Sequence, residues 1–408
     1  MHLSRRITGI LAEGNDGWGV FYRARDMIAA GRAVVELTIG EHDIRTDPTI
    51  LAAMDSAARS GHTGYAAIPG IAALRRAIAE RVTARTGVAT GPENVLVTPG
   101  GQSALFAAHL AAGDPGDRAL FIDPYYVTYP GTLRALGLHP VPVATNPARA
   151  FRPQFEDINA VAGGARSLLI NSPNNPTGTV YDRATLDGIA RAVQDHDLWL
   201  ISDEVYDTQI WEGAHLSPRA LPDMAGRTLV IGSMSKSHAM TGSRIGWIVG
   251  PQAAIGHLAN LATNTTYGVP GFVQDAALFA LRAGAALEQR ISAPFRRRRA
   301  LAEAVLAGQI AVRALPAQGA IYLMLDIRAT GLSGEAFALA LLERHAIAVM
   351  PGESFGNCAA GHVRVAMTVE DNIFTSALGT LVEFAQEMTR DGAMRRHLEA
   401  GPRTREKF

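Results

Sequence analysis

The sequence predicts an α/β fold, in which a large domain with a mostly parallel sheet sandwiched by helices is joined to a smaller α+β domain. Between about residues 92 and 250, short apolar runs alternate with amphipathic stretches of helical spacing, a pattern typical of right-handed crossovers between parallel strands. The chain of 408 residues is also too long for one small core. We therefore expect a large domain over residues 45–285 and a small domain that combines 1–44 with 286–408.

The expected elements follow one another in a regular order. The strands of the large domain are 94–98, 118–122, 167–171, 198–202, 228–231 and 244–249, with helices such as 103–112 and 183–195 between them. The small domain is expected to contain helices near 26–30, at 284–306 and at 335–344, and strands at 34–38, 321–327, 347–350 and 363–367. From about Arg390 the chain is charged and poor in large apolar residues, so we expect it to fray.

Composition excludes several classes of function. The 38 basic and 38 acidic residues balance, which argues against a nucleic-acid surface because phosphate binding needs a clustered basic excess. No run approaches 18 uninterrupted apolar residues, so we expect no membrane span. The single cysteine, Cys358, rules out an intrachain disulfide, and the first six residues lack the apolar stretch of a secretory signal. We expect a cytoplasmic protein without nucleic-acid, membrane or metal partners.

Polar clusters follow five of the expected strands. In chain order they are Gly100-Gly101-Gln102, residues 123–126, residues 171–178, residues 203–207 and residues 233–236. Ligands of open α/β sheets bind outside the carboxyl ends of the strands. Five polar clusters at five strand ends therefore predict one shared crevice.

The cluster around Lys236 is the most informative of the five. Lys236 stands between two serines, with hydroxyls at Ser233 and Ser235 and a guanidinium eight positions later at Arg244. A buried ammonium without a partner is costly, so the position is poorly suited to a core strand. It suits a site where the amine forms an imine with a carbonyl cofactor while hydroxyls and a guanidinium hold a phosphate. A solvated loop lysine is the alternative for this motif taken alone.

With these clusters in place, the chain resembles the class I aminotransferases, which are fold-type I enzymes dependent on pyridoxal phosphate. The resemblance is to the aspartate aminotransferase-like subgroup, and in detail to its arginine–pyruvate transaminase branch. It covers about residues 15–385 and rests on motifs in the family's order. They are Asn174-Asn175-Pro176-Thr177-Gly178, Ser202-Asp203-Glu204-Val205-Tyr206, the stretch 233–244, and Arg364.

The resemblance implies pyridoxal 5′-phosphate as cofactor and a role for each motif residue. Lys236 would form the imine and move the proton, and Asp203 would pair with the pyridinium nitrogen. Tyr206 and Asn175 would donate to the phenolic oxygen of the cofactor. The remaining cofactor contacts would come from Ser233, Ser235, Arg244, the backbone of Gly101 and Gln102, and the ring of Tyr126. From the residues alone, Asn175 is as well explained as a turn residue, and Tyr126 as a core aromatic.

The resemblance also implies how substrate is bound. Arg364 would hold the α-carboxylate of the amino acid, and Asn175 and Gly40 would assist it. A surface arginine and an ordinary turn glycine are the alternatives for Arg364 and Gly40. Tyr65 matches a tyrosine that reaches the phosphate of the neighbouring subunit, which implies a homodimer.

The implied reaction moves an amino group from an L-amino acid to a 2-oxo acid, pyruvate or 2-oxoglutarate, by a ping-pong mechanism. Aspartate-preferring relatives commonly carry a lysine where this chain has Gln102, so we expect a donor that is not strictly acidic. A basic donor would need an acidic partner, for which Glu13, Asp16 and Glu41 are candidates. The alternative reaction is a lyase of the C–S β-lyase type on the same scaffold. A dehydrogenase is disfavoured because no G-x-G-x-x-G follows a first strand.

Overall fold

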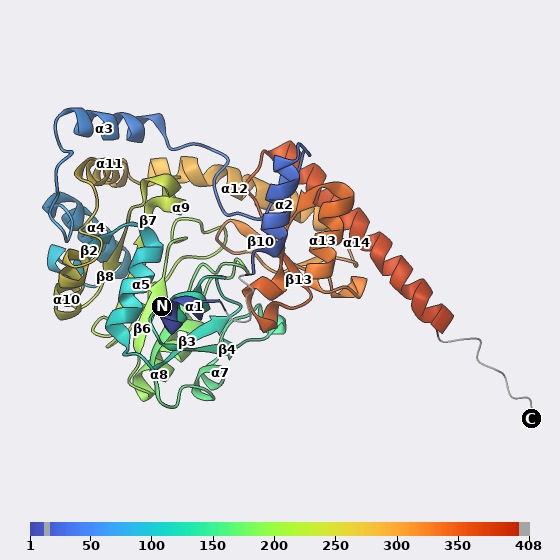
Figure 1. The fold of residues 1–408 in the computed structure, drawn as a ribbon, viewed down its shortest axis with the longest axis horizontal. Helices are drawn as coiled ribbons and strands as arrows, with labels where there is room; N and C mark the ends of the chain where they lie inside the picture. Colours follow the sequence, from blue (N-terminus) through green and yellow to red (C-terminus); the bar gives the residue numbers. More distant parts are fainter. Residues whose placement is uncertain (12–16, 400–408) are drawn as a thin grey trace, which may run out of the picture.

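The computed structural model describes residues 1–11 and 17–399, and its largest sheet has seven strands (Figure 1). Their order is β2 (Val95–Thr98), β8 (Gly246–Val249), β7 (Thr228–Ser233), β6 (Trp199–Asp203), β5 (Ala165–Asn171), β3 (Arg118–Asp123) and β4 (His139–Ala144). Neighbouring strands are parallel except at β8, which is antiparallel to both β2 and β7. The predicted α/β fold with a mostly parallel sheet is confirmed.

Strand β4, which the sequence analysis did not predict, lies at one edge of this sheet. It contains Pro140 and Pro142, and proline has no N–H to donate to a neighbouring strand. An edge strand needs one partner, and β4 pairs with β3 alone. The two prolines make this strand hard to recognise in the sequence. They are tolerated because β4 lies at the edge of the sheet.

Helices cover both faces of the large sheet. One face carries α5 (Gly100–Ala112), α6 (Tyr129–Ala135) and α10 (Gln252–Thr263). The other carries α4 (Ala72–Thr86), α7 (Phe155–Asn159), α8 (Arg183–Asp195) and α11 (Gly271–Arg282), with α3 (Pro48–Arg59) packed on α11. Leu169 of β5 packs in the core on the face covered by α5, and its neighbour Leu168 packs in the core on the face covered by α8. Strands buried on both faces in this way are typical of parallel sheets.

A second, antiparallel sheet lies beside the first. Its order is β12 (Met350–Pro351), β13 (His362–Ala366), β10 (Tyr322–Asp326) and β9 (Arg313–Ala314). The helices around it are α2 (Gly19–Ala29), α12 (Ala285–Leu306), α13 (Gly334–His345) and α14 (Asp371–Glu399). The N-terminal segment belongs to this part of the structure, because β1 (Val35–Glu36) pairs with β11 (Ile347–Ala348) and α2 lies beside α13 (Figure 1). The division at residues 45 and 285 stays a prediction.

Helices lie near both ends of the described chain, a short one at the N-terminal end and a long one at the C-terminal end. At the N-terminus a short helix, α1 (Arg5–Thr8), begins after Ser4, whose hydroxyl caps it. At the other end α14 continues to Glu399 and projects from the body of the molecule, so the helix is longer than the fraying expected from Arg390 (Figure 1). Within the described ranges, none of the helices combines the length and the apolar character needed to cross a bilayer.

Candidate active site

A cavity of about 320 Å³ lies where the carboxyl ends of β5, β6 and β7 face the smaller sheet. Its volume is in the range of small-molecule sites. Residues from all five polar clusters line it, including Gly101, Tyr126 and Asn175. All the residues predicted from the sequence to bind the cofactor or the substrate carboxylate line this cavity, with one exception, Tyr65. The expected shared crevice is therefore present in the structure.

Lys236 lies on a four-residue helix, α9 (Met234–Ser237), that follows β7 directly. The Ser233 hydroxyl caps this helix by accepting from the Ser235 N–H at 3.1 Å. Lys236 Nζ donates to the carbonyl of Gly40. Burial lowers the pKa of Lys236 to about 8, Arg364 adds to the effect and Glu41 opposes it. The neutral amine is therefore accessible near neutral pH, as a nucleophilic lysine requires.

Asp203 ends β6 with its carboxyl group buried at the floor of the cavity. Its Oδ2 accepts from the Tyr129 hydroxyl at 2.7 Å, and its Oδ1 accepts from the Val205 N–H at 3.3 Å. Burial raises the pKa of Asp203 to about 6, although the Tyr129 hydrogen bond works in the opposite direction. A cation opposite this carboxyl would lower its pKa again. The sequence analysis did not predict Tyr129, which is the first residue of α6 and the third residue after Tyr126.

Arg364 of β13 is 1% exposed and has no carboxylate partner among the described residues. Its Nη1 donates to Asn175 Oδ1 at 2.8 Å and its Nη2 to the carbonyl of Thr38, while Nε has no partner in the described structure. The rings of Tyr322 and Phe355 lie 4.3 and 4.5 Å from its guanidinium carbon. Burial lowers the pKa of Arg364. A buried guanidinium without an anion beside a cavity is suited to bind a carboxylate ligand.

Tyr322 of β10 is a cavity residue that the sequence analysis did not identify as one. Its hydroxyl lies 2.9 Å from that of Tyr206, and Asn175 Nδ2 donates to it at 3.5 Å. Burial raises the pKa of Tyr206 well above its usual value. A Cβ on Gly40 would lie 1.8 Å from the Tyr322 hydroxyl oxygen, so only glycine fits there. Trp18 also lines the cavity and was not predicted.

The N-terminus of α5 and the segment after β7 together form an anion site. The N–H groups of Gly101 and Gln102 lie in the first turn of α5, where the helix dipole favours negative charge. Arg244 approaches the same turn so closely that a Cβ on Gly100, whose φ is +81°, would lie 2.5 Å from its Nη2. With the hydroxyls of Ser233 and Ser235 on the same wall, these donors could hold a phosphate group.

The side chain of Gln102 is fixed by two threonines at the start of α6. The Thr132 hydroxyl donates to the carbonyl of Thr128 at 3.0 Å, so its oxygen is left to accept from Gln102 Nε2 at 2.9 Å. Thr128 donates to Gln102 Oε1 at 3.2 Å. The cavity wall at this position is therefore polar, ordered and uncharged.

The other candidates lie in different surroundings. Tyr126 lines the cavity, and burial raises its pKa to about 12. Glu41 lines it too, and accepts from the Thr241 hydroxyl at 2.8 Å. Tyr65 is 89% exposed and stacks edge-on against Tyr267, with ring centroids 5.0 Å apart. The remaining two acidic candidates, Glu13 and Asp16, are outside the described residues.

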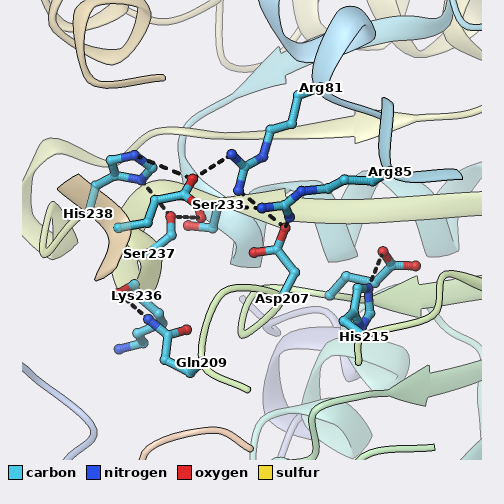
Figure 2. Close-up of polar contacts among 11 residues, drawn as sticks. Arg81, Arg85, Asp207, Gln209, His215, Ser233, Lys236, Ser237 and His238 are labelled. Atoms are coloured by element: carbon cyan, nitrogen blue, oxygen red, sulfur yellow. Dashed lines mark hydrogen bonds and ion pairs between the residues drawn. The ribbon is translucent and has the colours of Figure 1, made fainter. Parts of the chain in front are cut away.

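Outside the cavity lining, a set of ion pairs joins three elements (Figure 2). Arg81 and Arg85 of α4 each contact both Asp207, in the loop after β6, and Glu288 of α12. Burial alone would raise the pKa of Asp207, but Arg85 and Arg81 hold it below its usual value. Asp207 directly follows Tyr206, so this cluster fixes the loop that carries that tyrosine.

The same loop also supports the lysine helix from behind. Gln209 Nε2 donates to the backbone carbonyl of Lys236 at 2.7 Å (Figure 2). On the next residue, the Ser237 hydroxyl lies 2.7 Å from His238 Nδ1. Burial lowers the pKa of His238 to about 4, so the imidazole is neutral at neutral pH. The backbone carbonyl of Lys236 is thus held by Gln209, a residue that does not line the cavity.

The chain is similar to known proteins along most of its length. It matches the model of the aminotransferase class I and II family over residues 32–381. It is 43% identical to the arginine–pyruvate transaminase of Pseudomonas aeruginosa over 90% of this chain and 93% of that protein. It is 37% identical to an aspartate/prephenate aminotransferase of Thermus thermophilus over 86% of this chain and 91% of the relative. The solved structure of Thermus thermophilus aspartate aminotransferase with maleate superposes with a TM-score of 0.88 at 34% identity, covering 94% of this chain and 100% of that one.

Proposed function

The chain belongs to the class I and II aminotransferases, and we propose that it moves an amino group from an L-amino acid to a 2-oxo acid by a ping-pong mechanism. One observation carries the proposal: a buried lysine amine and a buried arginine without an anionic partner line the same cavity. A transaminase needs this pair, because the amine would hold the cofactor and the guanidinium would orient the amino acid.

The cofactor of this family is pyridoxal 5′-phosphate, and the residues of the cavity fit it. The anion site formed by Arg244, the two serine hydroxyls and the first turn of α5 matches its phosphate. Asp203 matches a protonated ring nitrogen, and Tyr126 offers a ring to stack against it. When bound, the cofactor supplies a carbonyl that condenses with amines and a ring that accepts the electron pair left at the substrate Cα.

The side chains would position the substrate and move its proton. Arg364 binds the α-carboxylate through its guanidinium, with Asn175 and the backbone of Gly40 beside it. Because Asn175 Oδ1 already accepts from Arg364, its Nδ2 is the end left to donate, together with the Tyr206 hydroxyl, to the cofactor's phenolic oxygen. Lys236 Nζ takes the proton from the substrate Cα, and its lowered pKa favours the neutral amine for this step.

Relatives with high identity are named as transaminases and aminotransferases, which favours transamination over the C–S β-lyase alternative. The cavity wall at Gln102 favours a donor that is not strictly acidic, because its amide is neutral and its hydrogen bonds are taken by Thr128 and Thr132. The relative from Pseudomonas aeruginosa is named for arginine and pyruvate. We therefore propose pyruvate as an acceptor, with 2-oxoglutarate as the second candidate.

A half-reaction screen tests this function. The holoenzyme is mixed with single amino acids, and loss of its yellow absorbance band with appearance of the pyridoxamine form is recorded. We expect conversion without any 2-oxo acid present, and return of the band when pyruvate or 2-oxoglutarate is added. Release of ammonia and a keto acid without an acceptor would favour the lyase, and no conversion by any amino acid would exclude transamination.

Replacing Gln102 by lysine is expected to shift donor preference toward aspartate. A cation at this wall would pair with the side-chain carboxylate, and an ion pair worth about 1.4–3 kcal/mol corresponds to a 10- to 150-fold change in relative kcat/KM. The measurement is the ratio of kcat/KM for aspartate to that for a neutral donor. Gln102→Met, which has similar length but no charge, is the control. A ratio that rises equally in both variants would show that charge is not the cause.

We also propose that the enzyme acts as a homodimer in which Tyr65 reaches the neighbouring active site. The exposure of Tyr65 and its position outside the cavity of its own chain support this. Tyr65→Ala is expected to weaken cofactor binding about tenfold, the effect of losing one hydrogen bond to a charged group. In a mixture with Lys236→Ala subunits, hybrid dimers should regain one site of normal affinity. A monomeric mass by light scattering, or no recovery on mixing, would refute the proposal.

A further inference from the structure

The side chain of Asp123 joins the two sheets at a point close to the active site. Asp123 is the last residue of β3, and its carboxylate lies against the loop between β12 and β13, residues 352–361. Its Oδ2 accepts from the Asn357 N–H at 3.1 Å, and both of its oxygens lie 3.3 Å from the Cys358 nitrogen. Beside this contact, the Tyr125 N–H donates to the carbonyl of Phe355 at 2.9 Å. The end of β3 and the 352–361 loop are therefore held together by several hydrogen bonds.

Stability alone gives no reason for a carboxylate at this point. Asp123 is 3% exposed and has no cationic partner among the described residues, so its charge is compensated by N–H groups of the loop. Burial raises its pKa to about 6, while the hydrogen bonds from Cys358 and Asn357 work against this rise. Desolvating a carboxylate is costly, and an apolar residue of similar size would avoid that cost. The group is better explained by the contact that it makes.

The loop is shaped to receive this carboxylate. Gly356 has a φ of +115°, a conformation that favours glycine, and a Cβ there would lie 2.2 Å from Asp123 Oδ1. Any side chain at position 356 would therefore displace the carboxylate from the N–H groups of Asn357 and Cys358.

Both sides of this contact continue into the walls of the active-site cavity. On the β3 side, Tyr126 follows Asp123 by three residues and lines the cavity. On the loop side, Phe355 packs on the guanidinium of Arg364. The loop also contacts the N-terminal segment through Ser354, whose hydroxyl donates to the carbonyl of Gly17 at 2.7 Å. A shift of the loop relative to β3 would therefore change the spacing between opposite walls of the site.

We propose that Asp123 is a positioning residue, which holds the 352–361 loop in register with the end of β3 and so fixes the distance between Arg364 and the wall that carries Tyr126. This proposal rests on the proposed function, because it takes Arg364 as the group that binds the substrate carboxylate. Asp123 does not itself line the cavity. It acts through the residues on either side of the contact.

The test replaces Asp123 by asparagine and measures two independent quantities. Asparagine retains one carbonyl acceptor but turns an NH₂ group toward the second backbone N–H, which is left without an acceptor. We expect faster hydrogen–deuterium exchange in peptides covering 352–361 in the holoenzyme. We also expect about tenfold weaker binding of an unreactive α-methyl amino acid, followed by the absorbance of the cofactor, because displacements near 1 Å cost up to about 100-fold at such sites.

The matched control is Asp117→Asn. Asp117 directly precedes β3 at its other end, and its Oδ2 accepts from a backbone N–H, that of Asp114, at 2.8 Å. This control is expected to keep the parental exchange of the loop and the parental affinity for the analogue. An affinity in Asp123→Asn equal to that of the control would overturn the positioning role, and unchanged exchange in the loop would overturn the contact itself.

A second variant covers the case in which Asp123→Asn does not fold. Gly356→Ala keeps Asp123 unchanged in the sequence but displaces its carboxylate from the loop, and it is expected to produce the same two changes. Parental exchange and affinity in this variant would overturn the proposal. Exchange is measured without substrate, so it still reports on the contact if the parent enzyme fails to bind the analogue, a result that counts against the proposed function instead.

Discussion

Replacing Lys236 by alanine is expected to lower the rate of both half-reactions by about 10⁴-fold or more. Losing a positioned acid–base group costs about 10²- to 10⁴-fold, and this variant also loses the amine that bonds to the cofactor. No other lysine of the described structure can replace it, because the second lysine of the sequence is at position 407, outside the described residues. The measurement is single-turnover conversion of the cofactor band by a good amino donor.

Because the sequence has two lysines, Lys236 and Lys407, this prediction has a chemical control. Borohydride reduction of the parent holoenzyme should attach the cofactor to one peptide, the one that contains Lys236, and leave Lys407 unmodified. In Lys236→Ala no peptide should be labelled, while the thermal stability of the protein should stay close to that of the parent. A small primary amine added to the variant should restore part of the activity if the missing group is a proton carrier. Activity near the parental rate in Lys236→Ala would exclude the mechanism.

Replacing Arg364 by lysine is expected to lower kcat/KM by about 10²- to 10³-fold, even though the positive charge remains. Truncating one partner of a buried, hydrogen-bonded charge pair costs about 2–5 kcal/mol. The guanidinium can donate to Asn175 and Thr38 and still present two parallel N–H groups to a planar carboxylate, whereas the three donors of an ammonium on one nitrogen cannot satisfy these four acceptors. The variant would also lose the stacked contacts with Tyr322 and Phe355. The measurement is steady-state kinetics with the donor identified by the half-reaction screen.

The substrate itself provides the control for this prediction. A primary amine that lacks the α-carboxylate should react slowly with the parent and at a similar rate with Arg364→Lys, because the lost interaction does not exist for it. If the variant loses as much activity toward this amine as toward the amino acid, Arg364 is supporting the fold of the site rather than binding the carboxylate.

The fold and the main site were predictable because both depend on local signals. Five of the six expected strands of the large sheet are apolar runs followed by polar residues, and parallel strands bring those ends to one edge. This reasoning placed Asp203, Asn175 and Lys236 in one crevice, where the structure has them. Strand β4 was not predicted because it contains Pro140 and Pro142, and prolines are typical of loops.

The residues that the sequence did not identify reach the cavity through tertiary packing. Tyr322 lies on a strand of the other sheet, and nothing in its neighbourhood in the sequence relates it to Tyr206 or Asn175. The same is true of Trp18, which comes from the N-terminal segment. Tyr129 had only a weak signal in the sequence, because it is the third residue after Tyr126. The orientation of the Gln102 amide depends on two threonines and could not be derived from its own position.

The cavity takes Gly40 from near the beginning of the chain and Arg364 from near its end. A ribosome making this protein therefore adds Asp203, Lys236 and Arg244, which are proposed to hold the cofactor, before Arg364, which is proposed to bind the substrate carboxylate. Lys236 and Arg244 come more than 100 residues before Arg364. During synthesis, the residues proposed to hold the cofactor are therefore present in the chain before the residue proposed to select the amino acid is added.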